Sequence, residues 1–280
     1  MTPFIVAELS CNHGGSLDRA LELVRAAADA GANAVKLQTW TPGTMVSDHA
    51  AVMETGPWAG QNLAKLYEEA HTPWHWHKPI FDYAQSRGIE AFSTPFDVGA
   101  LEFLETLGCP RYKIASFEII DLDLIKSVAA TGKPLIMSTG MATRKEIALA
   151  TVAAYSQKCR DLTLLKCTSA YPASAEDANL ATMQALARGY PWCGVGLSDH
   201  TRGIGVAVGA AALGATVIEK HLTLLRADGG PDAAFSMEPD EFEDMVIACR
   251  QAAAAIGRVH FGPTIAEMPM VEVRRIRNVR

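Results

Sequence analysis

Short apolar runs recur along the chain, and each is followed by polar side chains that could bind a ligand or react. The runs lie between residues 4 and 222. In order they are Phe4–Ala7 before Glu8, Ala34–Val35 before Lys36, Ile89–Phe92 before Ser93 and Thr94, Tyr112 before Lys113 and Ser116, Leu135–Met137 before Ser138, Leu162–Leu165 before Lys166 to Ser169, Val195–Leu197 before Ser198 to His200, and Val217–Ile218 before Glu219 to His221. Short continuous apolar runs of this kind are typical of buried strands.

Segments with the length and periodicity of amphipathic helices separate these runs, for example Leu17–Ala30, Val98–Leu107, Leu122–Thr131, Arg144–Ser156 and Glu241–Ile256. This alternation predicts a parallel sheet buried on both faces. A doubly wound open sheet would alternate in the same way, but eight repeats favour a closed (β/α)8 TIM barrel. Because the carboxyl ends of barrel strands meet at one mouth, the polar residues should line one site.

The length and charge of the chain agree with one barrel. The 280 residues, of which 49% are hydrophobic, suit a single barrel of about 250 residues. We predict a catalytic barrel over residues 1–262 and a basic tail over residues 263–280. The net charge of −6 argues against nucleic acid or an anionic membrane as the main partner. Five arginines follow position 257, and we expect them in a solvated or partly frayed tail.

The sequence also predicts a cytoplasmic protein. The first strand begins so close to Met1 that no signal peptide fits, and no apolar stretch reaches the roughly 20 residues of a membrane span. Six cysteines without CxxC spacing suit reduced thiols rather than disulfides or structural zinc. Cys11 and Cys167 lie near strand ends, but no sequence neighbour would lower their pKa, so we expect no nucleophilic role.

Two histidines are candidate metal ligands. His200 and His221 follow the seventh and eighth strands, which are adjacent in a barrel. Two imidazoles with carboxylates nearby, such as Asp199, Glu219 and Glu8, suit Mn²⁺, Fe²⁺, Co²⁺ or Zn²⁺ better than Mg²⁺. Such a site would polarise a carbonyl or orient a water. The alternative is that the histidines only bind loop backbone by hydrogen bonds.

Two lysines indicate an anion site. Lys36 and Lys113 each end an otherwise apolar strand, where an ammonium group is costly unless it reaches the mouth or a partner. With the hydroxyls of Thr94, Ser116 and Ser138 they would form a pocket for phosphate and carboxylate. A backbone amide in the turn at residues 138–140 could add a donor. A Schiff-base lysine is the competing hypothesis.

The ordered motifs resemble those of the sialic acid synthase family, whose members condense phosphoenolpyruvate with an amino-sugar to form a nine-carbon keto-acid sugar. The resemblance spans about residues 4 to 265. It rests on FIVAELSCNHGG at 4–15, AVKLQT at 34–39, FSTPFD at 92–97, YKIAS at 112–116, GKPLIMSTGMA at 132–142, CTSAYP at 167–172, LSDHT at 197–201, VIEKHLT at 217–223 and GGPD at 229–232. Within the family, HTPWHWH at 71–77, SFEI at 116–119, KCTSAYPA at 166–173 and RADGGPDAAFS at 226–236 resemble the pseudaminic acid synthase branch.

The resemblance implies a role for each matching position. His200 and His221 would hold a divalent metal, for which manganese is preferred to magnesium, and Glu8 would manage a proton near the reacting centre or fix a metal-bound water. Phosphoenolpyruvate would be bound by Lys36, Thr94, Lys113, Ser116, Ser138, Ser169 and Ser198. The amino-sugar would face Glu118, Tyr171 and Asp232.

One departure from the family pattern affects the acceptor. Family members normally continue into a small antifreeze-like domain that helps to cover the mouth of a partner subunit, whereas this sequence ends at Arg280. We therefore expect the basic tail in place of that domain, and we leave open the acceptor sugar and a possible homodimer. Two alternatives also stay open: a related synthase that adds phosphoenolpyruvate to a different aldehyde, and a non-catalytic paralogue that binds sugar or phosphate.

Overall fold

The structure, a computed structural model, describes residues 2–45, 52, 54, 58–157 and 159–277. Eight parallel strands close into a barrel in sequence order, and β1 pairs with β8. The strands are β1 (Phe4–Glu8), β2 (Ala34–Thr39), β3 (Glu90–Pro95), β4 (Tyr112–Ile114), β5 (Leu135–Ser138), β6 (Leu162–Cys167), β7 (Gly194–Asp199) and β8 (Val217–His221). The prediction of a single-domain (β/α)8 barrel is confirmed.

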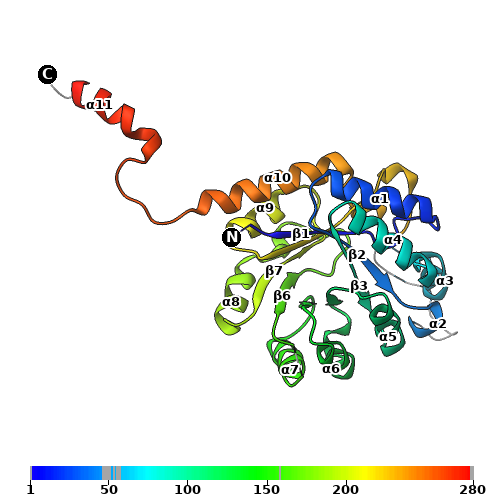
Figure 1. Cartoon of the computed structure of the whole chain (residues 1–280). Coiled ribbons are helices and arrows are strands. Elements are labelled where there is room, and N and C mark those ends of the chain that lie inside the picture. The colour runs from blue at the N-terminus through cyan, green and yellow to red at the C-terminus, as the bar shows by residue number, and fades with distance from the viewer. Residues whose placement is uncertain (1, 46–51, 53, 55–57, 158, 278–280) are drawn as a thin grey trace.

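Helices surround the barrel, as Figure 1 shows. They are α1 (Leu17–Asp29), α2 (Pro42–Met45), α3 (Leu63–Ala70), α4 (Trp74–Ser86), α5 (Val98–Thr106), α6 (Leu122–Ala130), α7 (Arg144–Tyr155), α8 (Ala181–Gly189), α9 (Gly205–Ala212) and α10 (Pro239–Ile256). Short 3₁₀ turns lie in the loops after β4, β6 and β8: η1 (Glu118–Ile120), η2 (Glu176–Ala178), η3 (Arg226–Asp228) and η4 (Ala233–Phe235). The five expected helices are all present, with small shifts at their ends.

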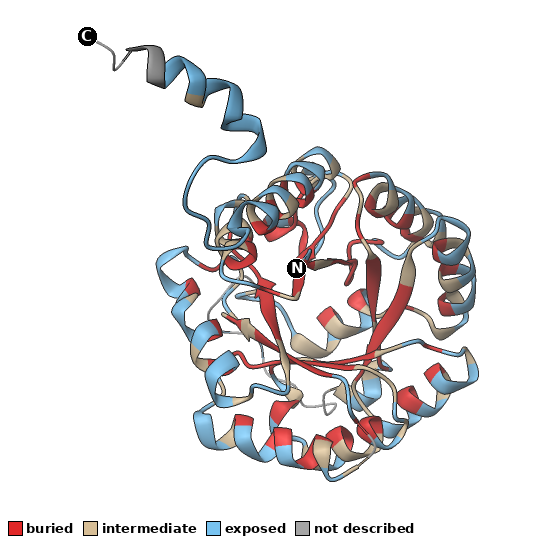
Figure 2. Cartoon of the chain, turned by 60° about the vertical axis from the view of Figure 1, so that its left-hand side comes forward, coloured by how far each residue is buried: buried red, intermediate tan, exposed pale blue. Residues whose placement is uncertain are grey.

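Local sequence explains where the helices begin and which face they bury. Thr143 and Glu146 form a reciprocal capping box at the start of α7, which satisfies two backbone amides of the first turn. In α1, the apolar positions Leu23, Val24 and Ala27 are buried. Figure 2 shows the same pattern around the ring, with buried strands inside and helices exposed on their outer side. Burial of this apolar face stabilises the helices more than intrinsic propensity does.

The strand register brings the site residues to the same level of the barrel. Glu8 pairs with Lys36 on β2 and with His221 on β8. Lys36 and Lys113 lie within β2 and β4 instead of at their ends, which corrects the sequence prediction. The apolar run Ala34–Val35 is shorter than β2, because the strand continues beyond it to Thr39.

A C-terminal arm, residues 257–277, leaves the barrel after α10. It contains η5 (Ile265–Glu267) and α11 (Met268–Arg277), which stands away from the barrel in Figure 1. Its apolar side chains are largely exposed, including Phe261 at 91% and Ile265 at 93%. The expected frayed tail is therefore partly helical. Within the described residues, no helix combines the length and apolar character that crossing a membrane requires.

Candidate active site

A buried group of charged and hydroxyl side chains lies inside the barrel. The Lys36 Nζ donates to Thr94 Oγ1 at 3.2 Å, and the Lys113 Nζ donates to Ser138 Oγ at 2.6 Å. The carboxylate of Glu219 lies 3.9 Å from both ammonium groups. The structure thus brings together the lysines and two of the hydroxyls that the sequence predicted, and it adds Glu219 as their shared counter-charge.

The carboxylates decide the protonation of these lysines. Burial alone would lower the pKa of Lys36, but Glu219 and Glu8 outweigh burial and raise it. The pKa of Lys113 is lowered, because burial is the stronger influence there. Glu8 forms an ion pair with Lys36 and accepts hydrogen bonds from the Ser10 amide at 2.8 Å and from Gln38 Nε2 at 3.2 Å.

Three further residues, Ser116, Gly140 and Ser169, lie close together. The Gly140 amide donates to Ser116 Oγ at 3.1 Å, so this amide is already engaged within the protein. A Cβ atom at Gly140 would lie 2.4 Å from Ser169 Oγ and 2.7 Å from Ser116 Oγ. Only glycine therefore allows these two predicted hydroxyls to approach the turn so closely. Ser198, another predicted residue, donates to Glu219 Oε1 at 3.2 Å.

His200 and His221 lie side by side, with ring centroids 5.4 Å apart. The Nδ1 of His200 lies 2.9 Å from the carbonyl oxygen of Thr168. Since a carbonyl only accepts, Nδ1 carries the proton and the lone pair is on Nε2. Burial lowers the pKa of His221 well below its usual value, which keeps this ring neutral, and its Nδ1 has no hydrogen-bond partner.

Although burial opposes it, the contact with Cys167 raises the pKa of His200, so the two rings differ in their tendency to be protonated. In their neutral forms, both rings offer a nitrogen without a strong protein partner, which suits a divalent cation. No group of three or more His, Cys, Asp or Glu side chains placed to bind a metal occurs in the described part of the chain. A metal here would therefore have two protein ligands and leave other positions to water and substrate. The backbone contact of His200 is compatible with this role, because a ligating histidine commonly donates its other N–H to a carbonyl.

Asp199 does not lie with the histidines, which corrects the expectation that it could serve the metal. Its Oδ2 accepts from the Lys220 Nζ at 2.6 Å, and both side chains are buried. Strand alternation turns Asp199 and Lys220 to the opposite face from Ser198 and Glu219. The carboxylate is thus satisfied outside the site.

Cys167 differs from what the sequence indicated. Burial opposes ionisation of the thiol, but the neighbouring His200 lowers the pKa of Cys167 to about 7. The Sγ atom lies 3.9 Å from His200 Nδ1. This contact could not be predicted from local sequence, because the two residues are 33 positions apart. All six cysteines are free thiols, as expected.

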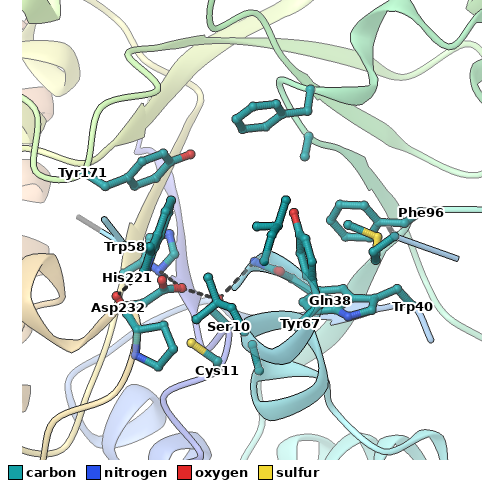
Figure 3. A pocket seen from close by; sticks show the side chains of 17 residues that line it. Ser10, Cys11, Gln38, Trp40, Trp58, Tyr67, Phe96, Tyr171, His221 and Asp232 are labelled. Atoms are coloured by element: carbon teal, nitrogen blue, oxygen red, sulfur yellow. Dashed lines mark hydrogen bonds and ion pairs between the residues drawn. The ribbon is translucent and has the colours of Figure 1, made fainter. Parts of the chain in front are cut away.

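A cavity of about 180 Å³ opens beside His221, and Figure 3 shows its lining. One side is apolar and aromatic, with Trp40 packed edge-to-face against Tyr67 and Phe96 at centroid distances of 6.0 and 5.1 Å. The other side is polar. Its lining includes Ser10, Gln38, Tyr171, His221 and Asp232. Sequence reasoning missed Ser10, Gln38 and the aromatic wall; the polar positions at 8, 10 and 38 were the available signal.

Two of the three residues expected to face the sugar, Tyr171 and Asp232, line this cavity, whereas Glu118 is not part of its lining. Tyr171 lies against His200, with ring centroids 4.4 Å apart. Asp232 lines the cavity, and its Oδ2 is 3.8 Å from His221 Nδ1. Glu118 is on η1, and burial raises its pKa to about 7. One of its carboxylate oxygens, Oε2, is buried without a hydrogen-bond partner.

The chain matches the NeuB family over residues 23–261, which covers β2 to β8 and both histidines but not β1. It belongs to the NeuB family. The strands that carry the buried lysines and hydroxyls all lie within this match. The family resemblance read from the motifs is thereby confirmed.

Three proteins of known identity illustrate which members of the family this chain is similar to. The chain is 46% identical over 260 residues to the pseudaminic acid synthase of Helicobacter pylori, covering 91% of this chain and 76% of that protein. It is 39% identical over 277 residues to the N,N'-diacetyllegionaminic acid synthase of Legionella pneumophila, covering 96% and 78%. A crystal structure of the N-acetylneuraminic acid synthetase of Leptospira borgpetersenii in complex with citrate superposes with a TM-score of 0.87 at 32% identity, covering 100% of this chain and 94% of that one. The chain is a synthase of this family.

Proposed function

We propose that this NeuB-family enzyme condenses phosphoenolpyruvate with an amino-sugar aldehyde to give a nonulosonic acid and phosphate. The observation that carries the proposal is the pair of buried lysines, which hydroxyls and Glu219 hold inside the same barrel as two neighbouring histidines. One of these histidines, His221, lines the half-aromatic cavity. C3 of phosphoenolpyruvate forms the new bond to the aldehyde carbon. Water adds at C2, and the C2–O bond to phosphate breaks, releasing inorganic phosphate.

Phosphoenolpyruvate is assigned to the lysine side. Lys36 and Lys113 supply charge-assisted donors for its phosphate and carboxylate, with Thr94 and Ser138 already hydrogen-bonded to the same ammonium groups. Ser116, Ser169 and Ser198 add hydroxyls around this ligand. Since Glu219 and Glu8 keep Lys36 protonated, a Schiff base on that lysine is disfavoured.

A divalent cation is assigned to His200 and His221. Two imidazole ligands favour manganese over magnesium, which prefers oxygen. When bound there, the cation would supply Lewis-acid polarisation of the acceptor aldehyde. His221 is neutral, whereas the contact with Cys167 raises the pKa of His200, so binding of the cation at His200 Nε2 competes with protonation of that ring.

The acceptor is assigned to the cavity. Tyr171 and Asp232 line the cavity together with His221, so hydroxyl and amide groups of a sugar would find partners on this side. Glu118 directly follows Phe117, which also lines the cavity, and we assign it to the same ligand. The aromatic wall of Trp40, Tyr67 and Phe96 offers an apolar surface to methyl groups. We assign Glu8, which contacts Lys36 and Gln38, the handling of a proton near the reacting centre. The higher identity to pseudaminic acid synthases supports an acceptor of that type.

Phosphate release tests the proposal. Wild-type protein with Mn²⁺ and phosphoenolpyruvate is assayed against 2-acetamido-2-deoxyhexoses and unsubstituted aldohexoses. We expect release only with an amino-sugar, and its loss in H200A and H221A, which should also fail to bind Mn²⁺ by calorimetry while melting normally. Preference for an unsubstituted aldose would favour the first alternative, a related synthase that adds phosphoenolpyruvate to a different aldehyde. Binding of the sugar or phosphoenolpyruvate without phosphate release would favour the second, a non-catalytic paralogue.

A further inference from the structure

Ser10 has a backbone conformation that serine rarely adopts. It follows β1 at the mouth of the barrel, with a φ of +42° in the left-handed region. This region is unfavourable for residues with a Cβ atom, and glycine normally occupies it. A strained residue that lines a cavity is commonly retained because its side chain has a task there.

The side chain of Ser10 is buried and lies between two polar groups. Gln38 Nε2 lies 3.2 Å from Ser10 Oγ, and Ser10 Oγ lies 2.5 Å from Asp232 Oδ2. The amide of Gln38 can only donate through this nitrogen, so the serine oxygen accepts from Gln38 and its hydrogen points at the carboxylate. Figure 3 shows this chain of interactions along the polar side of the cavity.

Other contacts between the loops hold the backbone around Asp232. Asn12 donates to the carbonyl of Leu222 and to Ser236 Oγ, each at 2.8 Å, and Ser236 Oγ donates to the carbonyl of Asp232 at 2.6 Å. These bonds fix the loop but do not orient the carboxylate. The Cys11 thiol also contacts the carboxylate, but a thiol is a weak donor.

We propose that Ser10 is a positioning residue, which holds the Asp232 carboxylate beside His221 so that this carboxylate can bind the acceptor. The inference rests on the proposed function, in which Asp232 faces the amino-sugar. Glycine would remove the backbone strain at position 10 but would also remove the hydroxyl. The strained serine is therefore explained by the hydrogen bond to Asp232.

Two substitutions separate the hydroxyl from the backbone. S10A removes the hydroxyl and keeps the strain, whereas S10G removes both. With the best amino-sugar of the phosphate-release panel, we expect both variants to raise the acceptor KM about tenfold, the effect of losing one hydrogen bond to a charged group. The KM for phosphoenolpyruvate should not change. S10G should melt at a higher temperature than S10A, because glycine suits the left-handed backbone.

Asn179 provides the matched control, since it has a φ of +43° and an exposed side chain outside the cavity. N179G should leave both KM values unchanged. In a D232N background, S10A should have little further effect on the acceptor KM, because the two residues act as one unit.

The outcomes are distinct. A normal acceptor KM in S10G with an impaired S10A would show that only the turn matters, and would overturn the role of the hydroxyl. Unchanged KM values in both variants, with an active wild type, would overturn the inference alone. Absence of phosphate release by the wild-type protein with every acceptor would overturn the proposed function and this role with it.

Discussion

Two buried ammonium groups are tolerated in this barrel because carboxylates lie close to them. Glu219 is within 3.9 Å of both Lys36 and Lys113, and Glu8 forms an ion pair with Lys36. Removal of an ion from water costs several kcal/mol, and this cost is offset only by good partners. The arrangement keeps positive charge in place for an anionic substrate without leaving it unpaired.

Lys36→Met and Lys113→Met should each weaken the binding of phosphoenolpyruvate and leave the binding of the acceptor unchanged. Loss of one charge-assisted contact should raise the phosphoenolpyruvate KM roughly ten- to a hundredfold. Lys166→Met is the control. Lys166 is a half-buried lysine whose Nζ donates hydrogen bonds to its sequence neighbours, the carbonyl of Cys167 and the hydroxyl of Thr168. Steady-state kinetics would measure both constants. A borohydride-trapped adduct on Lys36 or Lys113 would instead identify a Schiff-base aldolase.

Glu118 shows that a site residue can reduce the stability of the fold. Burial raises its pKa from 4.5 to about 7. As the pH rises from about 4.5 to 7, the unfolded chain releases this proton before the native protein does, so the free energy of unfolding falls. Above pH 7 the carboxylate is charged in both states, and the free energy of unfolding stays lowered by the full cost of burying that charge.

Glu118→Gln should therefore stabilise the protein at pH 8, by about 1–3 kcal/mol, and have little effect at pH 4.5. Urea unfolding at the two pH values would measure this difference. The exposed Glu102 of α5 offers the control substitution Glu102→Gln, which should change stability little at either pH. An equal effect of Glu118→Gln at both pH values would contradict the raised pKa.

At the scale of elements, a buried ion pair joins the ends of β7 and β8. Lys220 Nζ lies 2.6 Å from Asp199 Oδ2 and 2.6 Å from the carbonyl of Thr201. Asp199 Oδ1 also accepts from the amide and the hydroxyl of Thr201. His200 lies between Asp199 and Thr201, and His221 follows Lys220, so this network fixes both histidines from behind the strands.

Lys220→Met should destabilise the protein by about 3–5 kcal/mol, because it leaves a buried carboxylate unpaired. The double variant with Asp199→Asn should be less destabilised than the sum of the single variants. Lys78→Met in the exposed pair with Asp82 should cost less than about 1 kcal/mol. Denaturant unfolding checks the stabilities, and calorimetry should show weaker Mn²⁺ binding in the Lys220 variant. Strictly additive effects would show that the pair does not act as a unit.

At the scale of the whole molecule, the C-terminal arm differs from the barrel because its apolar side chains are exposed. Val259, Phe261, Ile265 and Met270 are all more than half exposed. Exposed apolar residues gathered on one segment are typical of an interaction surface. If the homodimer left open by the sequence forms, this segment is where we expect its apolar contacts.

Deletion of residues 258–280 should convert a dimer into a monomer in sedimentation experiments and raise the acceptor KM. The phosphoenolpyruvate KM and the melting temperature of the barrel should stay the same, since the buried lysines lie far from the arm in sequence and inside the barrel. Substitution of Phe261 and Ile265 by Ser in the full chain tests the apolar contacts separately. Unchanged assembly and kinetics in both variants would exclude the arm from either role.

The sequence by itself determined the barrel and the position of its site. Eight apolar runs with helical spacers leave few other ways to bury both faces of a parallel sheet, and strand polarity then gathers the residues that follow the runs. His200 and His221 could be paired in advance because strands adjacent in order are adjacent in a barrel. Helix bounds such as Leu122–Ala130 were also predictable, because apolar periodicity and capping residues act over a few positions.

Only the tertiary structure decided which polar groups satisfy one another. Strand alternation directs Asp199 towards Lys220 and Glu219 towards Lys36 and Lys113. When a strand is buried on both faces, its local sequence does not show which residues point into the barrel and which point outward. The hydrogen bond of Ser10 to Asp232 joins residues 222 positions apart. Its geometry depends on how two loops meet across the first and last strands, which is settled by barrel closure and not by any segment of the chain.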